Sequence, residues 1–273
     1  MTSQDGGLPV DAALDALRLP AAGRPVASAL SADEAILLDQ VGFEPAGLVV
    51  GASVIQLTGY AAMANSLSQN GEMVELSNAL METRRRAISR LVAAAAGAPA
   101  DGVVGVSLDA GDLRSSSYQV HMTAIGTAVR LKSGKRPHAM GAFSAALSGQ
   151  DVHLLDRAGY APLGIVAGVC AYHVGWRGFA QWASGVTQNT EMTLVTEALY
   201  EARELAMTRL QDQALALKAD GVIGLTVTER PTGWGSHIIE FAATGTAVRV
   251  TAGGYKPLSP QLVIDLAADK APV

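Results

Sequence analysis

The feature that most constrains this chain is a repeat within its own sequence. Residues 99–109 (PADGVVGVSLD) match residues 218–228 (KADGVIGLTVT), and residues 124–130 (AIGTAVR) match residues 243–249 (ATGTAVR), both at an offset of 119 residues. Self-similarity at a fixed offset is the signature of duplicated structural units. The chain is therefore predicted to fold as two similar domains in tandem.

The register of the repeat also holds upstream, which indicates where each domain begins. Residues 29–51 match residues 146–168 at an offset of 117, and a two-residue insertion in the second copy reconciles the two offsets. Residues 256–266 (KPLSPQLVIDL) resemble the opening of the repeat and are either a truncated third opening or an amphipathic tail helix. The predicted organisation is an N-terminal tail (1–27), repeat 1 (28–133), repeat 2 (134–252) and a C-terminal tail (253–273).

Each repeat has the same predicted order of secondary structure. Ser31 and Glu34 form a capping-box pattern before a short helix, and Gly42 can take the left-handed conformation that ends it. Apolar residues at steps of three and four then predict a long helix, and two strand-like runs follow an Asp-Gly turn. The expected elements are short strands (47–50 and 164–167), long helices (72–96 and 191–218) and strand pairs (103–108 with 119–131, and 222–227 with 238–250).

The predicted fold class is α+β, with two tandem two-layer domains. Within each domain, one long helix lies on a small, mainly antiparallel sheet. Gly51 and Gly168 indicate either a bulge or a close backbone approach. Asn70, with Asn189 or Thr190 in repeat 2, is expected to cap the long helix. Such small sheets leave exposed edges, which favours pairing with another copy.

Composition excludes several classes of protein. Hydrophobic residues make up 49% and charged residues 16% of the chain, which excludes a disordered protein. A net charge of −5 and an aromatic content of 5% argue against nucleic-acid binding. The sequence shows no signal-peptide pattern and no run approaching the roughly 20 apolar residues of a membrane span. We therefore expect a cytoplasmic protein with no nucleic-acid partner and no membrane span.

The sequence carries no recognisable catalytic pattern. It has no G-x-S-x-G elbow, no Walker motif and no G-x-G-x-x-G loop in a strand–helix context. Its single cysteine lies in an apolar, strand-like setting without an evident base. These observations predict a protein that is not an enzyme, unless catalytic groups assemble between subunits.

A metal site has one candidate pair of ligands. Cys170 and His173 are three residues apart, so they can meet on a helical turn but point to opposite faces of an extended strand. No C-x-x-C, H-x-x-x-H or H-E-x-x-H pattern accompanies them. The pair is either a site for a divalent or soft metal ion, or a small apolar cysteine beside a partly exposed histidine.

Three pairs of carboxylates occupy corresponding positions in the repeats, namely Glu72 with Glu191, Glu82 with Glu201 and Asp101 with Asp220. In a symmetric assembly, copies of one such residue can gather around a hard cation. The alternative is a structural role at the start of the helix, on its surface or in the turn after it. Glu82 and Arg86 are four residues apart and are expected to form a surface ion pair worth ~0.3–0.5 kcal/mol.

The two repeats differ most in the segment before the long helix. In repeat 2 this segment carries four aromatic residues, Tyr172, Trp176, Phe179 and Trp182. A divergent aromatic segment on a repeated frame is a candidate interaction surface for assembly or for a ligand. The alternative is a loop whose aromatic side chains complete the local core.

The chain resembles the YbjQ-like family, often labelled heavy-metal-binding. The resemblance rests on residues 199–227 (LYEARELAMTRLQDQALALKADGVIGLTV), on GTAVR at 126–130 and 245–249, and on GLVVG at 47–51. It implies a domain related to the dodecin-like folds that assembles as a pentameric ring. With two copies per chain, we expect five chains to stack one ring on another, in preference to alternation around a single ring.

Together these features predict a homo-oligomeric, ring-forming scaffold or adaptor that binds a protein partner. The family label leaves heavy-metal binding or sensing as an alternative function. Storage of a small ligand at subunit clefts is a second alternative, which the dodecin-like relationship implies.

Overall fold

A computed structural model describes residues 26–57, 70–111, 119–133, 142–174, 193–231 and 238–251. Trp176, Phe179, Trp182 and Glu191 lie outside the described residues, as does the C-terminal fragment that resembles a repeat opening.

The helices and long strands follow the same order in both repeats, whereas the short strands β2 and β5 are each described in one repeat. The described elements of repeat 1 are α2 (Ala32–Gln40), β1 (Phe43–Gln56), β2 (Gly71–Glu72), α4 (Val74–Gly97), β3 (Gly102–Ala110) and β4 (Gln119–Leu131). Those of repeat 2 are β5 (Phe143–Ser144), α5 (Gly149–Arg157), β6 (Tyr160–His173), α7 (Thr193–Ala216), β7 (Gly221–Pro231) and β8 (Ile238–Val250). No described helix combines the length and the apolar character needed to cross a membrane.

The strands form two four-stranded sheets, and each sheet includes one short strand from the other repeat. The first sheet has the order β1-β4-β3-β5 and the second has the order β2-β6-β8-β7. The three long strands of each sheet are antiparallel, as the sequence predicts. However, β5 of repeat 2 pairs with β3 of repeat 1, and β2 of repeat 1 pairs with β6 of repeat 2.

One long helix lies on each sheet at a point where a glycine lets the backbones approach. A Cβ atom on Gly51 would lie 2.1 Å from the carbonyl oxygen of Ala87 in α4. A Cβ atom on Gly168 would lie 1.8 Å from the carbonyl oxygen of Ala206 in α7. Of the two predictions for these glycines, the close approach is therefore the one confirmed, and the α+β class with a helix on each sheet is confirmed with it.

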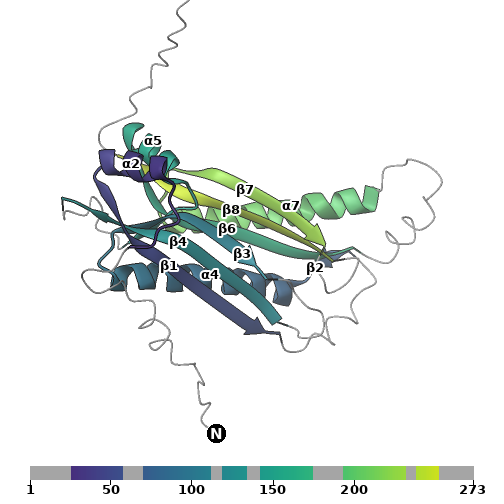
Figure 1. Ribbon diagram of the computed structural model, residues 1–273. Helices are drawn as coiled ribbons and strands as arrows, with labels where there is room; N and C mark the ends of the chain where they lie inside the picture. Colours follow the sequence, from purple (N-terminus) through teal and green to yellow (C-terminus); the bar gives the residue numbers. More distant parts are fainter. Residues whose placement is uncertain are drawn as a thin grey trace, which may run out of the picture.

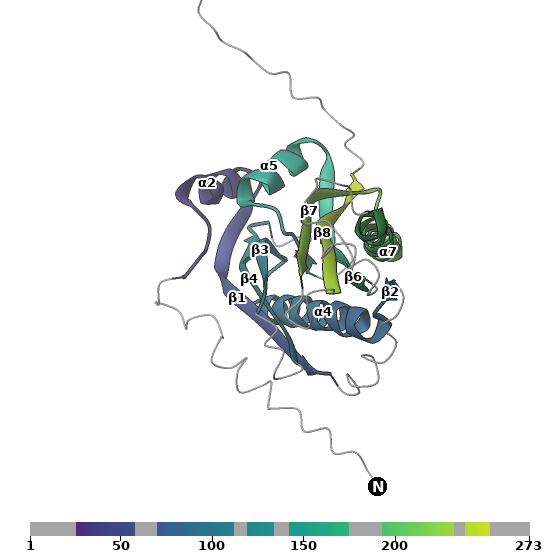
Figure 2. The ribbon, with the colours of Figure 1, turned by 90° about the vertical axis from the view of Figure 1, so that its right-hand side faces the viewer.

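The helix α4 has a second buried face, so the two repeats are not independent two-layer domains. One face of α4 packs on β1 and β4 of its own sheet, and the other contacts β6 of repeat 2. The helix α7 packs on the opposite side of the second sheet. Figure 2 shows the two sheets beside each other, with α4 beneath them and α7 at the outer side of the second sheet.

The two short helices pack together at one end of the molecule. Each begins with a capping box, formed by Ser31 with Glu34 in α2 and by Ser148 with Asp151 in α5. Each is followed by a glycine with positive φ, as the sequence predicts, namely Gly42 at +84° and Gly159 at +78°. The contact between α2 and α5 is visible in Figure 1.

Two expected boundaries are wrong, and both errors have a tertiary cause. Strands β1 and β6 are each 14 residues long instead of four, because they pair along the full length of β4 and β8. Glu72 does not start the long helix but lies in β2, which pairs with the other repeat. The N-cap of α4 is Met73, which makes no side-chain capping bond, so Asn70 is not the cap.

We predict that Gly168→Ala lowers the free energy of unfolding by about 1–3 kcal/mol, because the added methyl group must displace α7 from β6. Gly71→Ala is the matched control, since a Cβ atom there meets nothing within 4 Å. Urea unfolding of both variants at one protein concentration measures the difference. Equal losses in the two variants would contradict the close approach as the cause.

Candidate assembly interface

The contact between the repeats, here called the inter-repeat joint, has an apolar centre. Met73, Leu76 and Leu80 of repeat 1 pack against Val169, Ala171, Ile238 and Ala242, which are all at most 8% exposed. These four residues lie on the face of the second sheet that is turned away from α7, which we call the rear face. The joint therefore brings the helix face of one repeat onto the rear face of the other.

Backbone hydrogen bonds connect the two repeats at one end of the joint. Gly71 and Glu72 pair with His173 and Tyr172 at the edge of the second sheet. The Met73 N–H donates to the Ala171 carbonyl at 2.8 Å. In return, the Ala171 N–H donates to the Ser77 hydroxyl at 2.9 Å.

At the other end of the joint, the opening segment of repeat 2, residues 143–147, forms backbone hydrogen bonds with repeat 1. The Ala145 N–H donates to the Val103 carbonyl at 2.8 Å, while the N–H groups of Gly105 and Val106 donate to the carbonyls of Leu147 and Ala145 at 2.8 and 3.0 Å. A further bond of 3.1 Å joins the Phe143 N–H to the Asp101 carbonyl. The segment thus acts as an added strand on β3.

A buried ion pair crosses the centre of the joint. Arg84 Nη2 of α4 lies 2.7 Å from Glu240 Oε1 of β8, and the two side chains are 6% and 1% exposed. Arg230 of β7 approaches the other carboxylate oxygen at 3.1 Å. Burial lowers the pKa of Arg84, while the nearby Glu240 carboxylate acts in the opposite direction. Because an unpaired buried charge is costly, this contact fixes how the repeats meet.

A second ion pair joins the repeats nearer the sheet edge. Glu72 Oε1 lies 2.6 Å from Arg209 Nη1 of α7, an ion pair rather than a well-angled hydrogen bond. Burial acts to raise the pKa of Glu72, but its polar contacts with Arg209 and Ser77 outweigh burial and lower it. Arg209 also donates to the Val169 carbonyl at 2.7 Å, which holds the guanidinium in place.

The other described glutamates of the predicted set are also occupied within the chain. Glu82 pairs with Arg85 at 2.6 Å and with Arg86 at 2.7 Å, so the expected Glu82–Arg86 pair is confirmed. Hydrogen bonds from these two arginines lower the pKa of Glu82 to about 2. Glu201 accepts a hydrogen bond from the Tyr172 hydroxyl. Glu72, Glu82 and Glu201 therefore each have a different local partner and do not gather at one place within the chain.

Tyr172 belongs to the core and not to a surface. It is 4% exposed and packs beneath α7 with Cys170 and Phe241. Burial, together with the hydrogen bond to Glu201, raises the pKa of its hydroxyl. Within the chain, its predicted role in an exposed interaction surface is therefore corrected to a packing role, because β6 extends further than the sequence indicated.

Strand β6 does not bring the predicted metal ligands together. Cys170 faces α7, whereas His173 lies on the other face of the strand, as alternation along a strand requires. Burial raises the pKa of the Cys170 thiol to about 12, which disfavours the thiolate that binds soft metals. Among the described residues, no three His, Cys, Asp or Glu side chains are grouped to hold a metal ion. The described residues therefore do not fit the metal that the family label implies.

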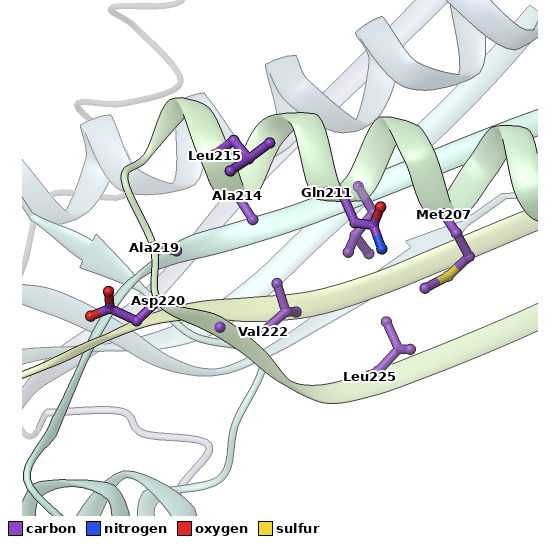
Figure 3. A pocket seen from close by; sticks show the side chains of 10 residues that line it. Met207, Gln211, Ala214, Leu215, Ala219, Asp220, Val222 and Leu225 are labelled. Carbon is purple, nitrogen blue, oxygen red and sulfur yellow. The ribbon is translucent and has the colours of Figure 1, made fainter.

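An open groove of about 480 Å³ lies between α7 and β7 (Figure 3). Met207, Gln211 and Leu215 line it from α7, while Val222 and Leu225 line it from β7. Leu215 is 70% exposed and Leu225 is 46% exposed. The sequence did not predict this groove, because its lining side chains are aliphatic and polar rather than aromatic. The repeat itself could have indicated the groove, because α4 and β3 form the corresponding face in repeat 1.

We predict that Glu240→Leu lowers the free energy of unfolding by about 3–5 kcal/mol, because it leaves the Arg84 guanidinium facing an uncharged side chain. The double variant Arg84→Met/Glu240→Leu should recover most of that loss. Glu82→Gln, which removes the surface ion pairs with Arg85 and Arg86, is the control and should cost less than about 1 kcal/mol. A Glu240→Leu variant as stable as Glu82→Gln would contradict the role of the buried pair.

Comparison with known proteins gives two matches. A model of the YbjQ-like family, described as "Putative heavy-metal-binding", matches residues 41–132 and 162–251. The chain is also 38% identical over 253 residues to the "Encapsulin nanocompartment protein Rv1762c" of Mycobacterium tuberculosis, a match that covers 91% of this chain and 95% of that protein. The two family matches fall on the two helix-on-sheet repeats, and the chain belongs to the YbjQ-like family with two tandem copies of its domain.

Proposed function

We propose that this chain is a non-enzymatic structural subunit that assembles with copies of itself into a protein compartment or a related closed scaffold. The observation that carries the proposal is the nature of the inter-repeat joint. It joins unlike surfaces, the helix face of repeat 1 and the rear face of repeat 2. Such a heterologous contact propagates until a ring closes or a filament forms.

Each repeat carries both kinds of surface because the two repeats have the same fold. A single chain uses only one surface of each kind in its inter-repeat joint. The helix face of repeat 2 and the rear face of repeat 1 remain at opposite ends of the chain. Exposed apolar side chains occur on both, including Leu225 beside the former and Leu48 and Val54 on the latter. Exposed apolar groups in that arrangement are typical of protein interfaces.

The chemistry of the joint also supports a structural role. Its most buried charges, Arg84 with Glu240 and Glu72 with Arg209, are engaged in holding the repeats together. The relative from Mycobacterium tuberculosis is named as an encapsulin nanocompartment protein, and its match extends across both repeats. A role as a building block of such a compartment is consistent with both observations.

Native mass spectrometry of freshly purified protein, without a chelator, tests this proposal. We expect masses at integer multiples of the 28.1 kDa chain, with no excess mass. A monomer at micromolar concentration would contradict self-assembly. A discrete excess per chain would instead favour metal binding or small-ligand storage over a purely structural role.

A further inference from the structure

We propose that a second copy of this chain docks head to tail on repeat 2, with its residues 26–30 added as a strand to the free edge of β7. This inference rests on the proposed function and names the two surfaces that meet. The docked segment fills the groove between α7 and β7 shown in Figure 3. The inter-repeat joint within one chain is the template for this contact.

Residues 26–30, the opening segment of repeat 1, correspond to residues 143–147 at the offset of 117. Both segments are anchored to their own sheet in the same way. The Ala146 N–H donates to the Thr246 hydroxyl at 3.1 Å, and the Ala29 N–H donates to the Thr127 hydroxyl at 3.0 Å. The outer side of residues 143–147 is paired with β3, whereas residues 26–29 are exposed. The opening segment of repeat 1 is therefore already positioned to pair.

The receiving edge is preformed as well. Strand β7 corresponds to β3 and ends the second sheet within the described part of the chain. Gly105 and Gly224 occupy the same bulge with φ of +61° and +60°. In the template, Gly105 and Val106 donate to the carbonyls of residues 147 and 145. Gly224 and Leu225 then donate to the carbonyls of residues 30 and 28 of the second copy.

The apolar contacts of the template have uncovered counterparts in repeat 2. Val106 of β3 is 5% exposed because repeat 2 covers it, whereas its counterpart Leu225 is 46% exposed. Ile165, on the rear face of the second sheet, is 8% exposed in the same cluster. Its counterpart on the first sheet, Leu48, is 36% exposed. Docking of the second copy covers Leu225 and Leu48 together.

The short helices extend the same pattern. In the template, α2 contacts α5, and His153 Nδ1 lies 2.9 Å from the Leu37 carbonyl oxygen. The residues at the corresponding positions are Ile36 and Leu154, which are 60% and 40% exposed. Both are apolar side chains that the described residues leave uncovered, and docking brings α2 of the second copy against α5.

The chain offers another occupant for the groove, namely its own C-terminal residues 256–266, which resemble a repeat opening. That segment would cover only the groove. It would leave the rear face of the first sheet exposed, including Val54 at 56%, whose counterpart Ala171 is fully buried in the template. A second copy accounts for both uncovered surfaces at once, and we therefore assign the groove to it.

Two properties of the assembly follow from this contact. The central Arg84–Glu240 pair of the template is not repeated, because Arg203 and His121 occupy those positions. The Glu72–Arg209 pair does have charged counterparts, which are Glu191 and Arg90. The contact between chains therefore lacks the central buried ion pair and depends mainly on apolar burial and strand pairing. Repeats 1 and 2 also alternate along the assembly, in place of the stacked rings expected from the sequence.

Two complementary variants test the proposal. Leu225→Glu blocks the groove, and Val26→Glu/Leu48→Glu blocks the opposite surface. Each variant alone should reduce the assembled fraction about tenfold or more, because docking would bury a carboxylate without a partner. In an equimolar mixture, the first variant keeps its opposite surface and the second keeps its groove. These two surfaces can meet once, so the mixture should form dimers and nothing larger. Mass photometry distinguishes the species.

Val74→Glu is the control, since Val74 is 51% exposed but lies at the start of α4, away from the proposed contact. It should assemble as the wild type does, and circular dichroism checks that all variants fold. If both blocking variants assemble normally while the wild type is oligomeric, this contact is wrong and the proposed function stands. A monomeric wild type overturns both. Loss of assembly on deletion of residues 252–273 but not in Val26→Glu/Leu48→Glu would assign the groove to the chain's own tail.

Discussion

The rest of the structure depends on the burial of α4 from two sides. A helix on a two-layer domain hides one apolar stripe, but α4 carries a second that includes Leu76 and Leu80. Among the described residues, the rear face of the second sheet covers most of that stripe, and Val120 of β4 lies in the same cluster. The exchange of β2 and β5 between the sheets and the burial of Arg84 against Glu240 both follow from this packing. The two repeats are thereby locked in one orientation.

Duplication then creates the conditions for assembly. A contact between unlike surfaces always leaves one surface of each kind at the ends of a chain. In this protein those surfaces are a groove beside α7 and a rear sheet face with exposed Leu48 and Val54. The residues at the positions of Arg84 and Glu240 in the other repeat are Arg203 and His121, so this buried pair specifies only the contact within the chain.

Much of the fold was predictable from the sequence, because its signals are local. The bounds of β4 and β8 agree with the expected strands, and the capping box at Ser31 agrees as well. The start of α4 and the length of β6 were not predictable, because pairing with the other repeat determines them. The same reason explains Tyr172, which belongs to an extension of β6 that only tertiary pairing supports. Periodicity identifies the apolar stripes of a helix, but it does not say which stripe meets which sheet, so the groove beside α7 was missed.

Hydrogen exchange of the assembled protein tests the central claim most directly, since amide protection reports strand pairing residue by residue. The account predicts that the N–H groups of Gly224 and Leu225 exchange slowly in the assembly. It further predicts that they exchange rapidly when dilution separates the chains, while the N–H groups of Gly105 and Val106, which are paired within the chain, stay protected. Rapid exchange at Gly224 and Leu225 in the intact assembly would contradict the account, because it would mean that no strand covers the edge of β7.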